Sequence, residues 1–170
     1  IEQHYPENNL EIILVDNGST ENKEASFKAC NPRIKYIRSE INLGFAGGNN
    51  LGLQHATGDY FFLVNNDTEF TAGLIETLME TMKANPEIGI ISPKIKYFDQ
   101  PEILQYAGFT AMNYYTCRNQ CIGQFEVDAG QYDHLVAPTG YIHGAAMMIS
   151  RTALLKAGEM AENFFLYYEE

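Results

Sequence analysis

The sequence has 170 residues, of which 45% are hydrophobic and 19% charged, a balance typical of one globular domain with a sizeable core. Its formal net charge of −11 argues against a nucleic-acid backbone as the main partner, because that needs clustered Lys and Arg. A nucleotide stays compatible with this charge, since a metal ion can screen its phosphates. Three cysteines, Cys30, Cys117 and Cys121, are too few for a disulfide scaffold or a zinc site, so we expect free thiols.

Short apolar runs alternate with helical patterns through the first 97 residues, which predicts an α/β fold with a largely parallel sheet. Continuous apolar runs suit strands that are buried on both faces of such a sheet. The expected strands are "LEIILVDNGST" around 12–15, "RIKYIRS" at 33–39, "DYFFLVNND" at 59–67 and "IGIISPKIKY" at 88–97.

Helices are expected between these strands. The first covers 21–30, with Ser19 or Thr20 as its cap. The second opens in a glycine-rich loop, "NLGFAGGNNLG" at 42–52, and ends at Gly58.

A third helix, "AGLIETLMETMKANP" at 72–86, is expected to be capped by Thr71. Its 3.6-residue period places on one face Leu74, Leu78 and Met82. From 98 to 136 the pattern loosens, which favours irregular loops with a hairpin that cover a ligand. "YIHGAAMMISR" then predicts a strand that enters a last helix at Thr152.

Two of the expected strands end in polar clusters that each contain an acid. Asp16-Asn17-Gly18-Ser19 follows the first strand, and Asn65-Asn66-Asp67-Thr68 follows the third. Ligands of an open α/β sheet bind outside the carboxyl ends of its strands, so we expect both clusters on one rim. Asp and Asn are also good turn and capping residues, which makes a purely structural turn the alternative for each cluster.

The cluster Asn65 to Asp67 suits a Mg²⁺ or Mn²⁺ ion that arrives with a diphosphate. Hard divalent ions prefer oxygen ligands, and phosphate oxygens can complete the coordination shell. Alternate residues at a strand end can aim Asn65 and Asp67 the same way. Only Asp67 is charged, so the protein alone would hold the metal weakly.

The glycine-rich loop at 42–52 differs from a dinucleotide fingerprint. It has no G-x-G-x-x-G, and the acid at a strand end, Asp16, precedes the loop instead of following it. Glycines at these positions let the backbone approach a base or ribose, or let a helix pack closely on the sheet.

Five segments together resemble family-2 glycosyltransferases of the GT-A fold, most closely rhamnosyltransferase-like bacterial members. They are "IILVDNGST", "NLGFAGGNNLG", "FFLVNNDTEF", "HGAAMMISR" and "FFLYYEE", in this order over nearly the whole chain. The resemblance implies a single domain with a Rossmann-like, open, mostly parallel sheet flanked by helices. Residues 1–97 would form its nucleotide-sugar-binding part, and 98–170 its irregular donor and acceptor side.

The resemblance also implies roles for individual residues. Asp16 would hydrogen-bond the pyrimidine base of a UDP- or dTDP-linked sugar. The other residues implied to bind the nucleotide are Asn17, Ser19, Asn42, Gly44, Asn49 and Asn66. Asp67 and Asn65 stand where the family has its D-x-D metal motif, with an amide in place of the first acid. His143 and Gly144 would lie beside the donor sugar and acceptor, although a histidine that only packs is the alternative.

The last two residues, Glu169 and Glu170, match the acidic pair that supplies the family's catalytic base. We expect Glu170 to be the base and keep Glu169 as the alternative; without the resemblance, the pair would read as a solvated acidic end. Inverting transfer needs a base that takes the acceptor hydroxyl proton, and a cation that stabilises the departing nucleoside diphosphate. The implied reaction is hexosyl transfer (EC 2.4) to a saccharide or lipid-linked acceptor in cell-envelope polysaccharide synthesis.

The family's first strand has no counterpart here, and the chain stops at the implied base. We therefore expect a piece of a longer polypeptide, truncated at both ends and inactive by itself. Without that strand, the sheet would expose unpaired backbone unless a neighbour fills the gap. No run of about eighteen apolar residues predicts a transmembrane helix, so we expect a cytoplasmic protein that reaches the inner face of the plasma membrane only through other regions.

Two other functions remain open from the sequence. A nucleotidyltransferase usually carries a basic, glycine-rich phosphate loop near its start, and no such loop is visible in these residues. A non-catalytic nucleotide-sugar-binding module would tolerate both Asn65 in the metal motif and the missing ends.

Overall fold

The computed structural model describes residues 9–164, in which strands and helices alternate from β1 to β4 and three further strands then precede the last helix. The elements are β1 (Ile12–Asn17), α1 (Glu24–Cys30), β2 (Ile34–Ser39), α2 (Gly44–Gln54), β3 (Tyr60–Val64), α3 (Leu74–Ala84), β4 (Ile90–Ile91), β5 (Ile95–Lys96), β6 (Leu104–Tyr106), β7 (Ala146–Ser150) and α4 (Arg151–Ala157). The predicted strand positions around β1, β2, β3 and β7 are thereby confirmed.

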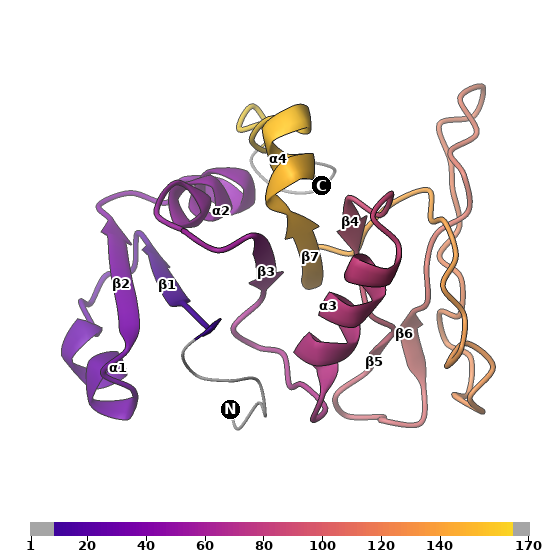
Figure 1. The fold of residues 1–170 in the computed structure, drawn as a ribbon, viewed down its shortest axis with the longest axis horizontal. Helices are drawn as coiled ribbons and strands as arrows, with labels where there is room; N and C mark the ends of the chain where they lie inside the picture. The colour runs from indigo at the N-terminus through magenta and orange to yellow at the C-terminus, as the bar shows by residue number, and fades with distance from the viewer. Residues whose placement is uncertain (1–8, 165–170) are drawn as a thin grey trace.

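The strands form three separate sheets, in the orders β1-β2, β3-β7-β4 and β5-β6. β1 and β2 are parallel, with Ile12 opposite Ile34 and Asn17 opposite Ser39, so their carboxyl ends lie at one edge. β7 lies between β3 and β4 and runs antiparallel to both, which leaves β3 and β4 pointing the same way. Figure 1 shows the β1-β2 pair at one end of the molecule, β3 and β7 at the centre, and β5-β6 toward the other end.

The antiparallel direction of β7 has a topological reason. β1 and β2 are joined by a helix, and a short helical crossover returns the chain in the same direction. β7 instead follows the irregular segment after β6, which imposes no direction. Local periodicity therefore indicated the strand but not its orientation.

Three helix starts differ from the expectations. α1 begins at Glu24, after Lys23 as its N-cap residue, and no side chain caps it in the way expected of Ser19 or Thr20. The Glu24 N–H donates to the Asn22 side chain instead. α2 begins at Gly44 and ends at Gln54, so most of the expected glycine-rich loop is helix. α3 begins at Leu74, after Gly73 with a φ of +78°, and Thr71 is not its cap.

β7 holds the core together because both of its faces are buried. Side chains alternate between the faces of a strand, so Met148 points one way and Met147 the other. Met148 packs with three buried residues of α3, namely Ile75, Leu78 and Met82. Met147 packs on the opposite face with Ile142 and Ile149. The expected burial of Leu78 and Met82 is confirmed, while Leu74 is only partly buried beside them.

Truncating Met148 to Ala is expected to lower the free energy of unfolding by about 2–5 kcal/mol, because the side chain is 2% exposed and its removal leaves a cavity. Leu155→Ala on α4, where the side chain is 78% exposed, is the control and should change it by less than about 0.5 kcal/mol. Urea denaturation followed by circular dichroism measures both. Equal effects of the two substitutions would contradict the assignment of β7 to the core.

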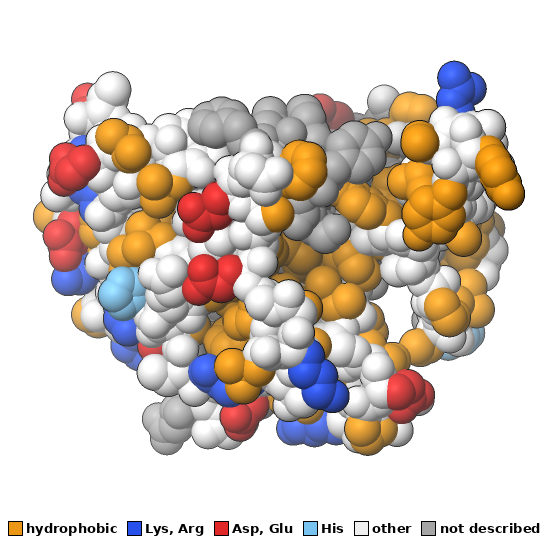
Figure 2. Space-filling view, turned by 90° about the horizontal axis from the view of Figure 1, so that it is seen from above, with side chains coloured by type: hydrophobic (Ala, Val, Ile, Leu, Met, Phe, Trp, Pro, Cys, Tyr) orange, Lys and Arg blue, Asp and Glu red, His pale blue; other side chains and the backbone are white. Residues whose placement is uncertain are grey.

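The segment between β5 and β7 forms an extended arm. Irregular loops with a hairpin were expected in this part of the chain. β5 pairs antiparallel with β6, and further isolated bridges join Ile103 to Val127, Phe109 to Cys121, and Asn113 to Arg118. Figure 1 shows this arm reaching away from the body, and Figure 2 shows hydrophobic side chains gathered at that end of the molecule. The three cysteines are free thiols.

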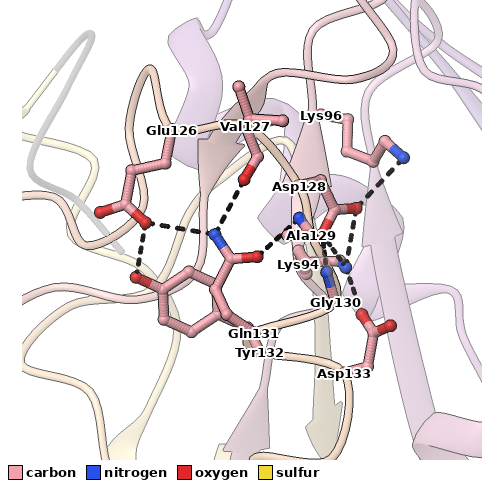
Figure 3. Close-up of polar contacts among 10 residues, drawn as sticks. All are labelled: Lys94, Lys96, Glu126, Val127, Asp128, Ala129, Gly130, Gln131, Tyr132 and Asp133. Atoms are coloured by element: carbon pink, nitrogen blue, oxygen red, sulfur yellow. Dashed lines mark hydrogen bonds and ion pairs between the residues drawn. The ribbon is translucent and has the colours of Figure 1, made fainter.

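An ion-pair cluster fastens the base of the arm to β5 (Figure 3). Asp128 Oδ1 lies 2.8 Å from Lys94 Nζ, and its Oδ2 lies 3.2 Å from Lys96 Nζ. Lys94 also contacts Asp133. The hydrogen bond from Lys94 is the main cause that lowers the pKa of Asp128 to about 2.

In the described part of the chain, no helix is long and apolar enough to cross a membrane.

Candidate functional site

The polar cluster after β1 meets the start of α2, so the first two sequence motifs form one site. Asn17 joins them: its Nδ2 donates to Gly44 O at 2.8 Å, and its Oδ1 accepts from Leu43 N at 2.9 Å. Asn42 adds a second link, because its Oδ1 accepts from Asn17 Nδ2 at 3.2 Å and from Gly44 N at 2.9 Å. The strand end and the helix start therefore hold each other in place.

Two glycines allow this close approach. Gly18 has a φ of +80°, and a Cβ there would lie 2.4 Å from the backbone nitrogen of Asn42. A Cβ on Gly48 would lie 2.9 Å from Asn17 Nδ2. Gly48 thus lets the helix pack closely on the end of β1, which is the packing alternative that the sequence left open.

Asp16 is the buried acid of this site, with a side chain that is 5% exposed. Its Oδ1 accepts from Ser19 N at 3.0 Å, and its Oδ2 accepts from the Tyr36 hydroxyl and from Arg38 Nη1, the latter at 3.1 Å. The hydrogen bonds from Ser19 and Tyr36, together with the charge of Arg38, lower the pKa of Asp16 to about 2. Asp16 is therefore a carboxylate at any physiological pH.

The second polar cluster is an exposed turn that directly follows β3. Thr68 donates from both its backbone N–H, at 3.3 Å, and its hydroxyl, at 2.7 Å, to Asn65 O. The Asn65 N–H donates to Ala145 O at 3.0 Å, which places this turn beside the segment before β7. Asn66 and Asp67 are exposed. A turn and a ligand site are compatible here, because the turn is built from backbone and Thr68 groups and leaves the Asp67 carboxylate available.

His143 and Gly144 belong to the segment that the Asn65 turn contacts. His143 Nδ1 accepts from Ala145 N at 3.2 Å, and its ring packs edge-on against Tyr106 with the ring centres 5.2 Å apart. The structure thus brings Asn65 next to the His143-Gly144 segment. Within residues 9–164, no hydrogen bond or ion pair joins this second cluster to the Asp16 cluster.

A family model described as "Glycosyl transferase family 2" matches residues 1–154 of the chain. The chain belongs to this family. Its relatives include the low-salt glycan biosynthesis hexosyltransferase Agl10 of Haloferax volcanii, 30% identical over 94% of this chain and 50% of that protein. Another is the N-acetylglucosaminyl-diphospho-decaprenol L-rhamnosyltransferase of Mycobacterium tuberculosis, 20% identical over 95% of this chain and 58% of that protein. The chain thus spans about half the length of these curated relatives.

A solved structure confirms the fold class. The mannosyltransferase PcManGT of Pyrobaculum calidifontis, in complex with GDP-Man and Mn²⁺, superposes with a TM-score of 0.63 at 18% identity, covering 95% of this chain and 41% of that one. The expected GT-A architecture of this family-2 glycosyltransferase chain is therefore confirmed.

Within residues 9–164, the turn after β3 offers few side-chain oxygens to a divalent ion. The possible ligands in this turn are the carboxylate oxygens of Asp67 and the amide oxygens of Asn65 and Asn66. No group of three or more His, Cys, Asp or Glu side chains that could hold a metal by itself exists in residues 9–164. This donor set fits an ion that brings phosphate oxygens with it and does not fit a preformed structural metal site.

Glu169 and Glu170, predicted from the resemblance to supply the base, lie outside the described residues, so their role stays a prediction. Asn49, expected to face the nucleotide, donates to Phe45 O within its own helix at 3.0 Å. Its contact with a nucleotide also stays a prediction.

Sequence reasoning missed three residues that the structure places at or beside this site. Tyr36 and Arg38 reach Asp16 from β2, where they are two residues apart and so share a face. This spacing on a strand expected to be parallel to the one that carries Asp16 was the sequence feature that could have indicated their contact with the acid. Asn50, 1% exposed in α2, bonds to a segment 110 residues away, and no local pattern could have indicated it.

Proposed function

We propose that this chain is the donor-binding part of an inverting glycosyltransferase that uses a nucleoside-diphosphate sugar. The observation that carries the proposal is the buried Asp16 carboxylate at the carboxyl edge of β1-β2, locked to the start of α2 by Asn17 and Asn42. In a family-2 chain, this arrangement suits recognition of a nucleobase. Gly44 and Ser19 would approach the ribose and base through their backbone.

The bonds that Asp16 already makes bear on which base it can recognise. A carboxylate can accept about four hydrogen bonds. Asp16 accepts from Ser19 N, the Tyr36 hydroxyl and Arg38, and a hydrogen bond from the Ser19 side chain is the largest cause of its lowered pKa. At most one acceptor position therefore remains, which favours the single imide N–H of uracil or thymine over the two adjacent donors of guanine. Together with the family resemblance, this leads us to propose a UDP- or dTDP-linked donor.

The diphosphate would bind near the turn after β3. Asp67, assisted by Asn65 and Asn66, would hold Mg²⁺ or Mn²⁺ together with phosphate oxygens. When bound, the ion supplies positive charge that stabilises the departing nucleoside diphosphate. The complex of PcManGT with GDP-Man and Mn²⁺ supports a divalent ion in this fold. Asn65 in place of an acid predicts that metal affinity is low without nucleotide.

The chemical step needs a base outside the described residues. Glu170, or Glu169, would take the proton of the acceptor hydroxyl as that oxygen attacks the anomeric carbon from the face opposite the leaving group. The bond from the anomeric carbon to the diphosphate oxygen breaks, and the configuration inverts. His143 and Gly144, beside Asn65, would line the donor sugar and acceptor side.

We also propose an acceptor and a cellular setting, on the basis of what the relatives are named for. The mycobacterial relative is named for a diphospho-decaprenol acceptor, which supports a lipid-linked saccharide. We place the reaction in cell-envelope polysaccharide synthesis, at the inner face of the plasma membrane. The alternative function is a non-catalytic nucleotide-sugar-binding module. The cluster Asn65-Asn66-Asp67 favours it because its single carboxylate would hold a metal ion weakly.

Thermal shift of the full-length protein tests the donor class. UDP- and dTDP-sugars with Mn²⁺ should raise the melting temperature, since a ligand at about 100 times its Kd stabilises by about 2.7 kcal/mol. GDP-mannose at the same concentration should raise it much less. An equal shift with GDP-mannose would overturn the pyrimidine assignment, and no shift with any nucleotide and metal would overturn the proposed function. Turnover of the sugar donor separates the enzyme from the binding module.

A further inference from the structure

Two side chains of β2, Tyr36 and Arg38, hold one oxygen of the buried Asp16 carboxylate. The Tyr36 hydroxyl and Arg38 Nη1 both donate to Asp16 Oδ2, the latter at 3.1 Å. The register of β2 against β1 places Arg38 directly opposite Asp16, and Tyr36 lies two residues earlier on the same face. Because a carboxylate oxygen has two lone pairs, Oδ2 has no capacity left for a ligand.

Both of these donors are themselves held in place. Arg38 Nη2 donates to Ser19 O at 2.8 Å, so one guanidinium joins the carboxylate to the far end of the turn after β1. The planar fork of arginine suits this two-point contact. The Tyr36 ring packs against Phe27 of α1, with ring centres 6.2 Å apart and planes inclined at 27°. Burial and the hydrogen bond to Asp16 raise the pKa of the Tyr36 hydroxyl, which keeps it protonated as a donor.

The other carboxylate oxygen of Asp16, Oδ1, is the one with capacity left. It accepts from Ser19 N at 3.0 Å, which leaves one lone pair. The Ser19 hydroxyl also hydrogen-bonds to Asp16, but this exposed side chain can rotate away from an incoming donor. The turn lies against the start of α2, since a Cβ on Gly18 would be 2.4 Å from Asn42 N. Oδ1 therefore belongs to the junction of the two motifs that we propose to bind the nucleotide.

We propose that Tyr36 and Arg38 are positioning residues for recognition of the nucleobase. By occupying Oδ2 they fix the carboxylate so that Oδ1 alone meets the base, and they limit the contact to one hydrogen bond from the imide N–H of uracil or thymine. They act through Asp16 and not on the donor itself. This inference rests on the proposed function and adds to it the residues that give Asp16 its selectivity.

The role is one of orientation and not of charge. The pKa of Asp16 is about 2, and loss of the Tyr36 hydroxyl would move it toward the ordinary 3.8. The acid is therefore ionised at neutral pH with or without Tyr36. What changes is the freedom of the carboxylate to rotate about its Cβ–Cγ bond, which moves Oδ1 away from the base.

A comparison of two nucleotides in the full-length protein isolates this contact. UDP carries the imide N–H, whereas in 3-methyl-UDP a methyl group replaces that hydrogen. Isothermal titration with Mn²⁺ should show that the parent protein prefers UDP by about tenfold or more, the range for a hydrogen bond to a charged group. The corresponding dTDP pair serves in the same way if the thermal-shift panel selects dTDP.

In Tyr36→Phe, the ratio of the two affinities should fall by about threefold or more, because the carboxylate no longer presents Oδ1 in a fixed direction. A merely structural role of Tyr36 would weaken both nucleotides alike and leave the ratio unchanged. Arg38→Lys is the second variant and carries the test if Tyr36→Phe fails to fold. It keeps the positive charge but loses the fork that bonds Asp16 and Ser19 O together, so the ratio should fall by about twofold or more.

Tyr132→Phe is the matched control. The Tyr132 hydroxyl donates to the Glu126 carboxylate at 3.0 Å, so the substitution removes the same kind of hydrogen bond (Figure 3). This pair lies on the arm, toward the other end of the molecule from β1 and β2. The ratio of UDP to 3-methyl-UDP affinity should therefore equal that of the parent protein.

The outcomes separate the two levels of inference. An unchanged ratio in Tyr36→Phe, or in Arg38→Lys where the first variant does not fold, would overturn the positioning role. Equal binding of the two nucleotides by the parent protein would also overturn it, since Asp16 would then not meet the imide. Failure of the parent protein to bind any nucleotide with a divalent ion would instead overturn the proposed function.

Discussion

Replacing Glu170 with Gln in the full-length protein is expected to reduce sugar transfer by about 10²–10⁴-fold, the usual contribution of a general base. The amide cannot accept the acceptor hydroxyl proton, whereas it is nearly isosteric with the carboxylate. Binding of the UDP- or dTDP-sugar with Mn²⁺ should therefore stay unchanged. Steady-state release of nucleotide, with a thermal shift in parallel, measures both effects.

Glu87→Gln, an exposed position after α3, is the matched control and should leave turnover unchanged. A larger loss in Glu169→Gln than in Glu170→Gln would assign the base to Glu169. Full turnover in both variants would remove the acidic pair from the chemistry and favour a different base.

Replacing Asp16 with Asn is expected to weaken binding of a UDP- or dTDP-nucleotide by about tenfold to a hundredfold, the range for losing a charged acceptor. The new amide would also direct N–H groups at Ser19 N or Arg38, which are donors themselves. Isothermal titration with UDP and Mn²⁺ measures the loss. Asn85→Asp, distant from this site, should bind as the parent protein does. Equal affinity in Asp16→Asn would contradict the base-binding role.

The stability contributed by Asp16 should also depend on pH in a defined window. Its pKa is about 2 in the folded protein, below the ordinary 3.8, so its contribution is fully present above pH 3.8. It is lost as the pH falls toward 2. The difference in melting temperature between the parent protein and D16N should therefore be constant from pH 5 to 8 and shrink below about pH 4. A difference that changes between pH 5 and 8 would mean that another group titrates at this site.

The site divides into parts that local sequence indicated and parts that it could not. Asp16 to Ser19 and Asn65 to Asp67 were found because each follows a short apolar run, and a polar group at the end of a buried strand is unusual. Tyr36 and Arg38 were missed because their importance depends on the register of β2 against β1, which places Arg38 opposite Asp16. Asn49 was named from the family resemblance, which gave no indication that Asn50 is the buried amide of α2.

The sequence by itself determined the strands β1, β2 and β3, the apolar face of α3, the polar ends of two strands and the family. These features depend on residues a few positions apart, where the periods of helix and strand act directly. Only the tertiary structure decided that α2 runs through Gly44, Gly47 and Gly48, since glycine disfavours helix and contacts with β1 outweigh that preference. It also decided the direction of β7 and the bonds of Asn50, because both depend on segments that meet only after the chain has folded.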